Sequence, residues 1–275
     1  MSSTTPSTTA ATVSRPGRAA TRTTAAGRLR SLARAELTLL GRSKGTMFAA
    51  MFVPLVMPFS VRQAADGMDL DGTGLSIGSV VLPSAIGFSL LFAVYSALVS
   101  VYAARREELV LKRLRTGEVR DIEILAGSAV PSVAVGFAQC LILTGACVAL
   151  LDVGAPDAPL HAVLGLLLAF ALWPVLAAVT ATFSRSVESA QVAAMPLLLV
   201  SFIGSGTLVP LEVMPDKLAA VCELLPLTPT IELIRGGWTG DMSASDALGA
   251  VVIAVAWIGV GVFAVRRWFR WEPRR

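Results

Sequence analysis

The apolar residues of this chain gather into six long blocks that contain no Asp, Glu, Lys or Arg. The blocks cover residues 46–61, 79–103, 124–151, 160–183, 191–209 and 247–265. A helix rises about 1.5 Å per residue, so about 20 residues cross a hydrocarbon core of about 30 Å. The last five blocks reach that length. The first is shorter and holds Pro54 and Pro58, which predict a kink. The pattern predicts an all-α integral membrane protein with six transmembrane helices.

The overall composition agrees with a membrane protein. Of 275 residues, 55% are hydrophobic and only 15% are charged, whereas soluble domains carry about 25% charged residues. A water-soluble fold of this size would lack the polar residues to cover its surface. This disfavours a cytosolic enzyme, a nucleic-acid-binding domain and a disordered protein.

The positions of the basic residues predict the orientation. If both termini are cytoplasmic and six spans alternate, all but Arg62, Lys217 and Arg235 of the 23 Lys and Arg residues fall inside. Cytoplasmic loops of membrane proteins carry such an excess of positive charge. We therefore expect six spans with the N- and C-termini in the cytosol, in a permease domain at 46–265 with a basic tail at 266–275.

The segment before the first block divides into two parts. Residues 1–27 are rich in Ser, Thr, Ala and Arg, which predicts a disordered basic tail without the apolar region of a cleaved signal peptide. Residues 28–45 have an apolar arc and a basic face that includes Arg30 and Arg34, which predicts an amphipathic helix in the headgroup layer. Glu36 falls within the apolar arc, where it either snorkels to water or pairs with an arginine.

Several kinds of chemistry are disfavoured by the sequence. The six blocks hold no ionisable relay of the sort that proton-driven transporters use. Three cysteines and one histidine have no metal-ligand spacing, so we predict no metal and no cofactor. An intramembrane serine protease is a weak alternative, because His161 is the only candidate base for Ser128, Ser132, Ser201 or Ser205. The Gly204-Ser205-Gly206 string instead predicts close helix packing or a break.

The loop at 105–123 is the first informative polar segment. Its first half has helical spacing and is predicted to continue the second span as a helix that stops at Gly117. A short second helix, roughly 118–125, is then expected to lead into the third span. Charges of both signs alternate through this loop, which is typical of a protein-binding surface. A solvated loop with internal ion pairs is the alternative.

The stretch at 210–246 is the second informative segment, and it is too long for a simple connection. Its apolar pieces 218–225 and 231–234 are each too short to span a bilayer. Prolines at Pro210, Pro215, Pro226 and Pro229 break them up. They predict two short helices that dip into the outer leaflet and return, with an ordinary extracellular cap as the alternative.

These features together resemble the ABC-2-type permeases, a family that includes bacterial exporters of the daunorubicin-resistance type. The resemblance covers about residues 28–267. It rests on the loop LKRLRTGEVRDIEILAG and on the stretch GTLVPLEVMPDKLAAVCELLPLTPTIELIRG. It implies a bacterial plasma-membrane permease that pairs with a second copy of itself and docks a separate cytosolic ATPase. No GxxxxGK[ST] phosphate-binding loop occurs in the chain, so we expect ATP hydrolysis to take place on that separate subunit.

The resemblance also implies roles for particular residues. The segment 117–125 corresponds to the coupling helix that enters a cleft on the ATPase, supported by 105–115. The ATPase-coupling loop would comprise Arg105, Arg106, Glu107, Arg113, Arg115, Gly117, Glu118, Arg120, Asp121 and Glu123. Residues 28–45 correspond to the connecting helix, with Arg30, Arg34 and Glu36. Residues 211–237 correspond to the outer re-entrant region, with Pro210, Pro215, Pro226, Pro229 and Arg235.

The function that these observations favour is export of a hydrophobic or amphipathic, antibiotic-like compound, driven by the separate ATPase. Two alternatives stay open at this stage. One is a permease of the same architecture for a polysaccharide or lipid, and the other is a non-transporting membrane sensor or assembly factor. No residue is predicted to be catalytic, and none is assigned to the substrate.

Overall fold

The computed structural model describes residues 77–115, 120–151, 153–207, 211 and 214–269, together with Thr24, Gly27, Arg30, Ser31, Arg34 and Thr38. Helices are its regular secondary structure, and the described residues contain no strand. Five helices are long and apolar enough to cross a membrane. They are Val80–Glu107, Asp121–Ala149, Pro159–Thr182, Val187–Gly204 and Ala244–Trp268. These confirm the last five predicted blocks, while block 46–61 lies outside the described residues.

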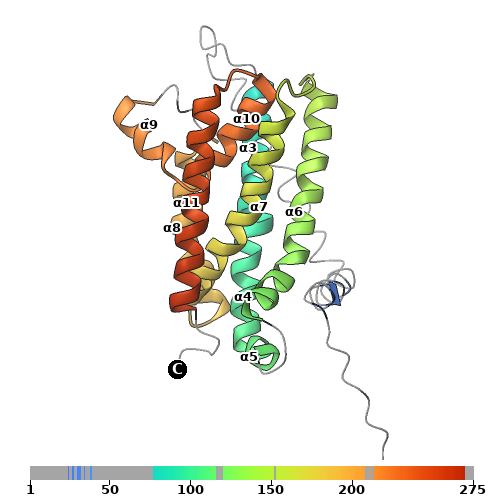
Figure 1. Cartoon of the computed structure of the whole chain (residues 1–275), viewed down its shortest axis with the longest axis vertical. Helices are drawn as coiled ribbons and strands as arrows, with labels where there is room; N and C mark the ends of the chain where they lie inside the picture. Colours follow the sequence, from blue (N-terminus) through green and yellow to red (C-terminus); the bar gives the residue numbers. More distant parts are fainter. Residues whose placement is uncertain are drawn as a thin grey trace, which may run out of the picture.

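The first of these spans is the centre of the bundle. It is built from α3 (Ile77–Ser89), a π-helical segment η1 (Leu90–Ser96) and α4 (Ala97–Glu107). It contacts α6 (Asp121–Leu151), α7 (Pro159–Thr182) and α8 (Val187–Gly204), and it is the most deeply buried of the five spans. Figure 1 shows α3 and α4 running behind α7, with α6 on one side. Movement of this central helix would therefore disturb every neighbour.

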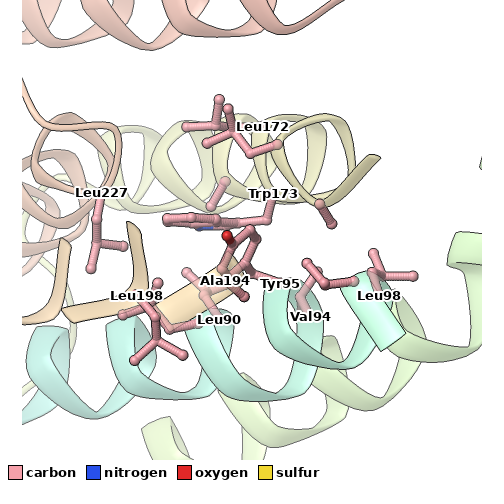
Figure 2. Close-up of a cluster of buried hydrophobic side chains, with 14 of the residues drawn as sticks. Leu90, Val94, Tyr95, Leu98, Leu172, Trp173, Ala194, Leu198 and Leu227 are labelled. Atoms are coloured by element: carbon pink, nitrogen blue, oxygen red, sulfur yellow. The ribbon is translucent and has the colours of Figure 1, made fainter. Parts of the chain in front are cut away.

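A cluster of apolar side chains holds the central helix to α7 and α8. Tyr95 of η1 packs against Trp173 of α7 with their ring centroids 5.4 Å apart. Ala194 and Leu198 of α8 close the same cluster, as Figure 2 shows. Small residues such as Ala194 let membrane helices approach closely, where van der Waals contact replaces the hydrophobic effect as the driving force.

The ends of the spans follow from local sequence signals. Helix α8 begins at Val187 because Ser186 and Ser189 form a reciprocal capping box. It ends at Gly204, and Gly206 follows with φ of 73°, a backbone conformation that favours glycine. The predicted break at the Gly-Ser-Gly string is therefore present. Helix α8 overlaps most of the predicted block 191–209, but each of its ends lies several residues before the corresponding end of the block. Helix α11 (Ala244–Trp268) continues past Val265 through Arg266 and Arg267, whose charges suit a helix C-terminus.

Two shorter helices lie between α8 and α11. Helix α9 (Asp216–Glu223) is mostly exposed, whereas α10 (Thr228–Thr239) is buried against α7, α3 and α11. Close approach to α7 needs glycine, since a Cβ on Gly237 would lie 2.5 Å from the backbone nitrogen of Ala162. Helix α10 extends beyond the predicted apolar piece 231–234 at both ends, whereas α9 starts two residues before the predicted piece 218–225 and ends two residues before that piece does.

The polar loop after the central span differs from its prediction. The helix does not run on through Arg115: it ends at Glu107, turns at Glu108 and Leu109, and restarts as α5 (Val110–Arg115). Leu109 takes a positive φ of 59°, which is costly for a residue with a branched side chain. The turn brings α5 against α4 and α6 and lets Leu111 become completely buried. Apolar burial thus overrides the helical spacing of the sequence.

The predicted short second helix at 118–125 is also corrected. From Asp121 onward these residues form the first turns of the 31-residue α6, with no break before the span. Asp121 and Glu123 lie in the first turn, where carboxylates offset the positive end of the helix dipole. The helix therefore starts three residues earlier than the apolar block at 124.

Candidate functional site: the basic end of the helix bundle

The end of the bundle where α4 and α11 finish and α6 and α8 begin gathers most of the predicted coupling residues, and we call it the basic end. Here α4, α5 and α6 all contact one another. The hydroxyl of Tyr102 on α4 donates to the carbonyl oxygen of Leu125 on α6 at 3.1 Å. The basic end therefore unites the first half of the predicted loop with its second half, while Gly117 and Glu118 lie outside the described residues.

Arg106 is the buried centre of this end. Only 1% of its surface is exposed. Its Nη1 and Nη2 nitrogens donate to the carbonyl oxygens of Ala181 and Ser184, each at 2.6 Å. The first carbonyl lies in the last turn of α7 and the second in the turn that follows it, near the negative end of the helix dipole. Arg106 thus fastens α4 to the end of α7, and its guanidinium is not on the surface.

Glu107, the next residue, makes the complementary contact to α8. Its carboxylate accepts from the backbone nitrogen of Val187 at 3.2 Å. Val187 is the first residue of α8, where unpaired N–H groups and a positive dipole favour an anion. Two adjacent side chains of opposite charge on α4 therefore hold both sides of the short turn between α7 and α8. We call Arg106 and Glu107 with this turn the α4 junction.

The remaining predicted coupling residues divide into structural and exposed ones. Glu123 is buried, and its Oε2 accepts from the backbone nitrogen of Arg120 at 3.1 Å, which caps the start of α6. The side chains of Arg113, Arg120 and Asp121 are exposed, and Arg105 is half-buried. Arg115 is the last residue of α5. The exposed set offers charges of both signs to a partner.

A ladder of polar contacts continues from the α4 junction into the span. Ser96 and Ser100 hydrogen-bond Gln191 of α8, and the hydroxyls of Tyr95 and Thr180 of α7 lie 3.0 Å apart. Nearer the other end, Ser89 donates to Oε1 of Gln139 on α6 at 2.7 Å. Sequence reasoning did not assign these residues. Its one signal was that Gln139 and Gln191 are amides inside otherwise apolar blocks.

Among the described residues, cavities lie at both ends of the bundle. The larger, about 980 Å³, is lined by α6, α7 and α11 and reaches the basic end at Arg120, Asp121 and Arg266. The smaller, about 480 Å³, lies at the opposite end between α9, α10 and α11, and Arg235 lines it together with Glu223, Glu232, Asp241 and Asp246.

The predicted re-entrant residues lie at the opposite end. Pro215 caps the start of α9, and Pro229 lies in the first turn of α10 with buried Pro226 before it. Proline is favoured at a helix start because the N–H that it lacks would be unsatisfied there. Pro210 lies outside the described residues. In the predicted connecting helix, Arg30 and Arg34 are helical and exposed, whereas Glu36, like Pro210, lies outside the described residues.

In the part of the chain that the structure covers, no side chains are arranged to bind a metal ion or to form a serine-protease site. Those residues contain no group of three or more His, Cys, Asp or Glu that would hold a metal ion. Cys140, Cys147 and Cys222 are buried thiols. Nδ1 of His161 is buried without a hydrogen-bond partner, and the Ser205 hydroxyl is bonded to the Ser201 carbonyl oxygen instead.

Five long apolar helices, one of them buried against three of the others, define a polytopic helical membrane protein. A family model for the ABC-2 type transporter matches residues 28–238. Because this match covers most of the chain, the protein belongs to the ABC-2 type transporter family, and it is a permease component of an ABC transporter, a class without an ATPase site of its own. No curated protein matches the chain at the significance required.

Proposed function

We propose that this protein is the membrane permease of an ATP-driven exporter and that a separate cytosolic ATPase docks on the basic end. In this proposal both termini are cytoplasmic, the exposed charges of α5 and the start of α6 contact the ATPase, and the permease works as a homodimer. The cargo is a hydrophobic or amphipathic, antibiotic-like compound that leaves the cell.

The α4 junction is the observation that carries the proposal. A displacement of α5 and the start of α6 would be transmitted directly to α4, since these three elements contact one another. Arg106 and Glu107 then connect α4 to the end of α7 and the start of α8. The basic end can therefore act as one unit that moves four helices when the ATPase subunits close, and the charge-free spans leave ATP as the source of energy.

The homodimer is supported by the unequal burial of the spans. Helices α8 and α11 are the least buried of the five. Most of the exposed large apolar residues of α8 follow one stripe, made of Val192, Met195, Leu199 and Ile203, and Val200 lies beside it. Such a stripe faces lipid or a second permease copy, and a dimer through α8 would place the α4 junction of each copy close to the shared path.

Copurification tests the proposed ATPase contact. The tagged permease is coexpressed with a candidate ABC ATPase subunit, and the amount of ATPase retained is measured for the wild type, Arg113→Glu and Asp121→Arg. We expect each reversal to lower retention, because it replaces complementary charges with like charges. Lys217→Glu, an exposed reversal on α9 at the opposite end, is the matched control. Equal retention by all four chains would contradict the proposed docking surface.

A further inference from the structure

The groove between α6, α7 and α11 has an apolar lining that the transport mechanism above does not use, although its mouth shares Arg120 and Asp121 with the proposed docking surface. Helix α7 forms its floor, and α6 and α11 contact α7 from either side (Figure 1). Its volume of about 980 Å³ lies near the top of the range for small-molecule sites, which is roughly 300–1,000 Å³. The lining residues that bear on its ligand are Arg120, Asp121, Ala129, Ala134, Phe137 and Arg266.

The groove is charged at one end and apolar along the rest. Arg120, Asp121 and Arg266 form its mouth, and the lining beyond them is almost entirely apolar as far as Phe137 and Phe170. From Arg120 to Phe137, α6 rises about 25 Å at 1.5 Å per residue. One bilayer leaflet with its headgroups is about 20–22 Å thick. The groove therefore has the polarity and about the depth of a single leaflet.

The charge at the mouth favours an anion. Arg120 and Arg266 are both exposed, and Arg267 extends the positive charge in the last turn of α11. Asp121 in the first turn of α6 opposes them, so one carboxylate stands against three arginines. Basic pockets between membrane helices bind the headgroups of anionic lipids.

The groove is also open to the side. Ile122 and Phe137 on its α6 wall remain largely exposed. A ligand with an acyl chain can therefore enter from within the bilayer, whereas a water-soluble anion would gain nothing from the apolar lining.

We propose that this groove is a binding site for an anionic phospholipid from the leaflet at the basic end. The phosphate lies between the guanidinium groups of Arg120 and Arg266, and an acyl chain lies along α6 over Ala129 and Ala134. This site is separate from the α4 junction, and the proposal goes beyond the transport function.

Lipid titration of the purified chain, followed by native mass spectrometry, tests this proposal without the ATPase or any cargo. The two probes are phosphatidylglycerol and phosphatidylcholine with identical acyl chains. We expect phosphatidylglycerol to bind more tightly to the wild type. Arg120→Gln and Arg266→Gln should each weaken its binding about fivefold, and the double variant should lose about 25-fold and with it the preference for the anionic lipid.

Matched variants separate a specific site from general lipid contact. Ala134→Trp fills the groove and should abolish tight phosphatidylglycerol binding, whereas Ala149→Trp, on an exposed position of α6 outside the groove, should not. Arg185→Gln removes an exposed arginine of the basic end that does not line the groove and should keep the preference. Equal binding of both lipids to the wild type, or selectivity that survives the double variant or Ala134→Trp, would overturn the proposal.

Discussion

Nη2 of Arg106 lies 2.6 Å from the carbonyl oxygen of Ser184, a residue 78 positions further along the chain. This contact joins the end of the central helix to the turn between α7 and α8. Its position explains why a charged residue is buried at the basic end, since the guanidinium donates to two backbone carbonyl oxygens at and just after the end of α7. The first predictions concern this junction.

Replacing Arg106 should destabilise the protein and weaken coupling. Arg106→Ala removes two charge-assisted hydrogen bonds, so we expect the free energy of unfolding to fall by about 3 kcal/mol. Arg106→Lys keeps the charge but cannot form both bonds in the same fork geometry, so it should lose about half as much. Thermal unfolding in detergent measures the loss. Equal stability of the wild type and Arg106→Ala would show that the two contacts contribute nothing.

Replacing Glu107 should affect α8 more than α4. Glu107→Ala removes the carboxylate that accepts from Val187, and loss of such a helix-start acceptor costs about 1 kcal/mol. With the ATPase bound, ATP hydrolysis should continue while transport falls, because α8 no longer follows α4. Glu108→Ala, an exposed neighbour in the turn after α4, is the control. If Glu108→Ala has the same effect on transport, the Glu107 contact has no special role.

The buried Ser89–Gln139 contact should couple the central helix to α6. Interhelical hydrogen bonds in membrane proteins contribute about 0.6 kcal/mol on average and up to about 1.7. A double-mutant cycle with Ser89→Ala and Gln139→Leu should give a coupling free energy in that range. Strict additivity of the two single effects would contradict the contact.

Glycine-to-alanine substitutions should change stability differently on the tightly packed α10 and on the open face of α11. Gly237→Ala would force a Cβ to 2.5 Å from the nitrogen of Ala162, so we expect a loss of about 1–3 kcal/mol. Gly259→Ala meets nothing within 4 Å, so it should be neutral or stabilise α11 by up to about 1 kcal/mol. Thermal unfolding of both variants gives the comparison. A tolerated Gly237→Ala would mean that α10 does not pack tightly on α7.

Much of the fold was predictable from the sequence because long uncharged segments have few alternatives to membrane helices. Five predicted spans and the break after Gly204 are present in the structure. The course of the polar loop was not predictable, because the burial of Arg106 depends on partners distant in sequence and that of Leu111 on the turn that packs α5 against α4 and α6. Helical spacing around Leu109 gave no sign of the turn there.

The candidate site was predictable only in part for the same reason. The family resemblance put Arg105, Arg106 and Glu107 into one group of predicted coupling residues, and they lie in the last turn of α4. It could not show that Arg106 turns inward to α7, while exposed Arg113 and Asp121 remain on the surface. A run of mixed charges marks a polar segment, but the contacts of each side chain depend on the tertiary fold.

The accessibility of two engineered cysteines tests the central claim, that the basic end faces the cytosol and meets the ATPase there. Arg113→Cys places a thiol at the basic end and Asp241→Cys places one at the opposite end, both at exposed positions. The three natural cysteines are buried, so their background should be low. In intact cells a membrane-impermeant maleimide should label Asp241→Cys at once and Arg113→Cys only after the membrane is permeabilised. Labelling of Arg113→Cys in intact cells, with Asp241→Cys protected, would contradict the account.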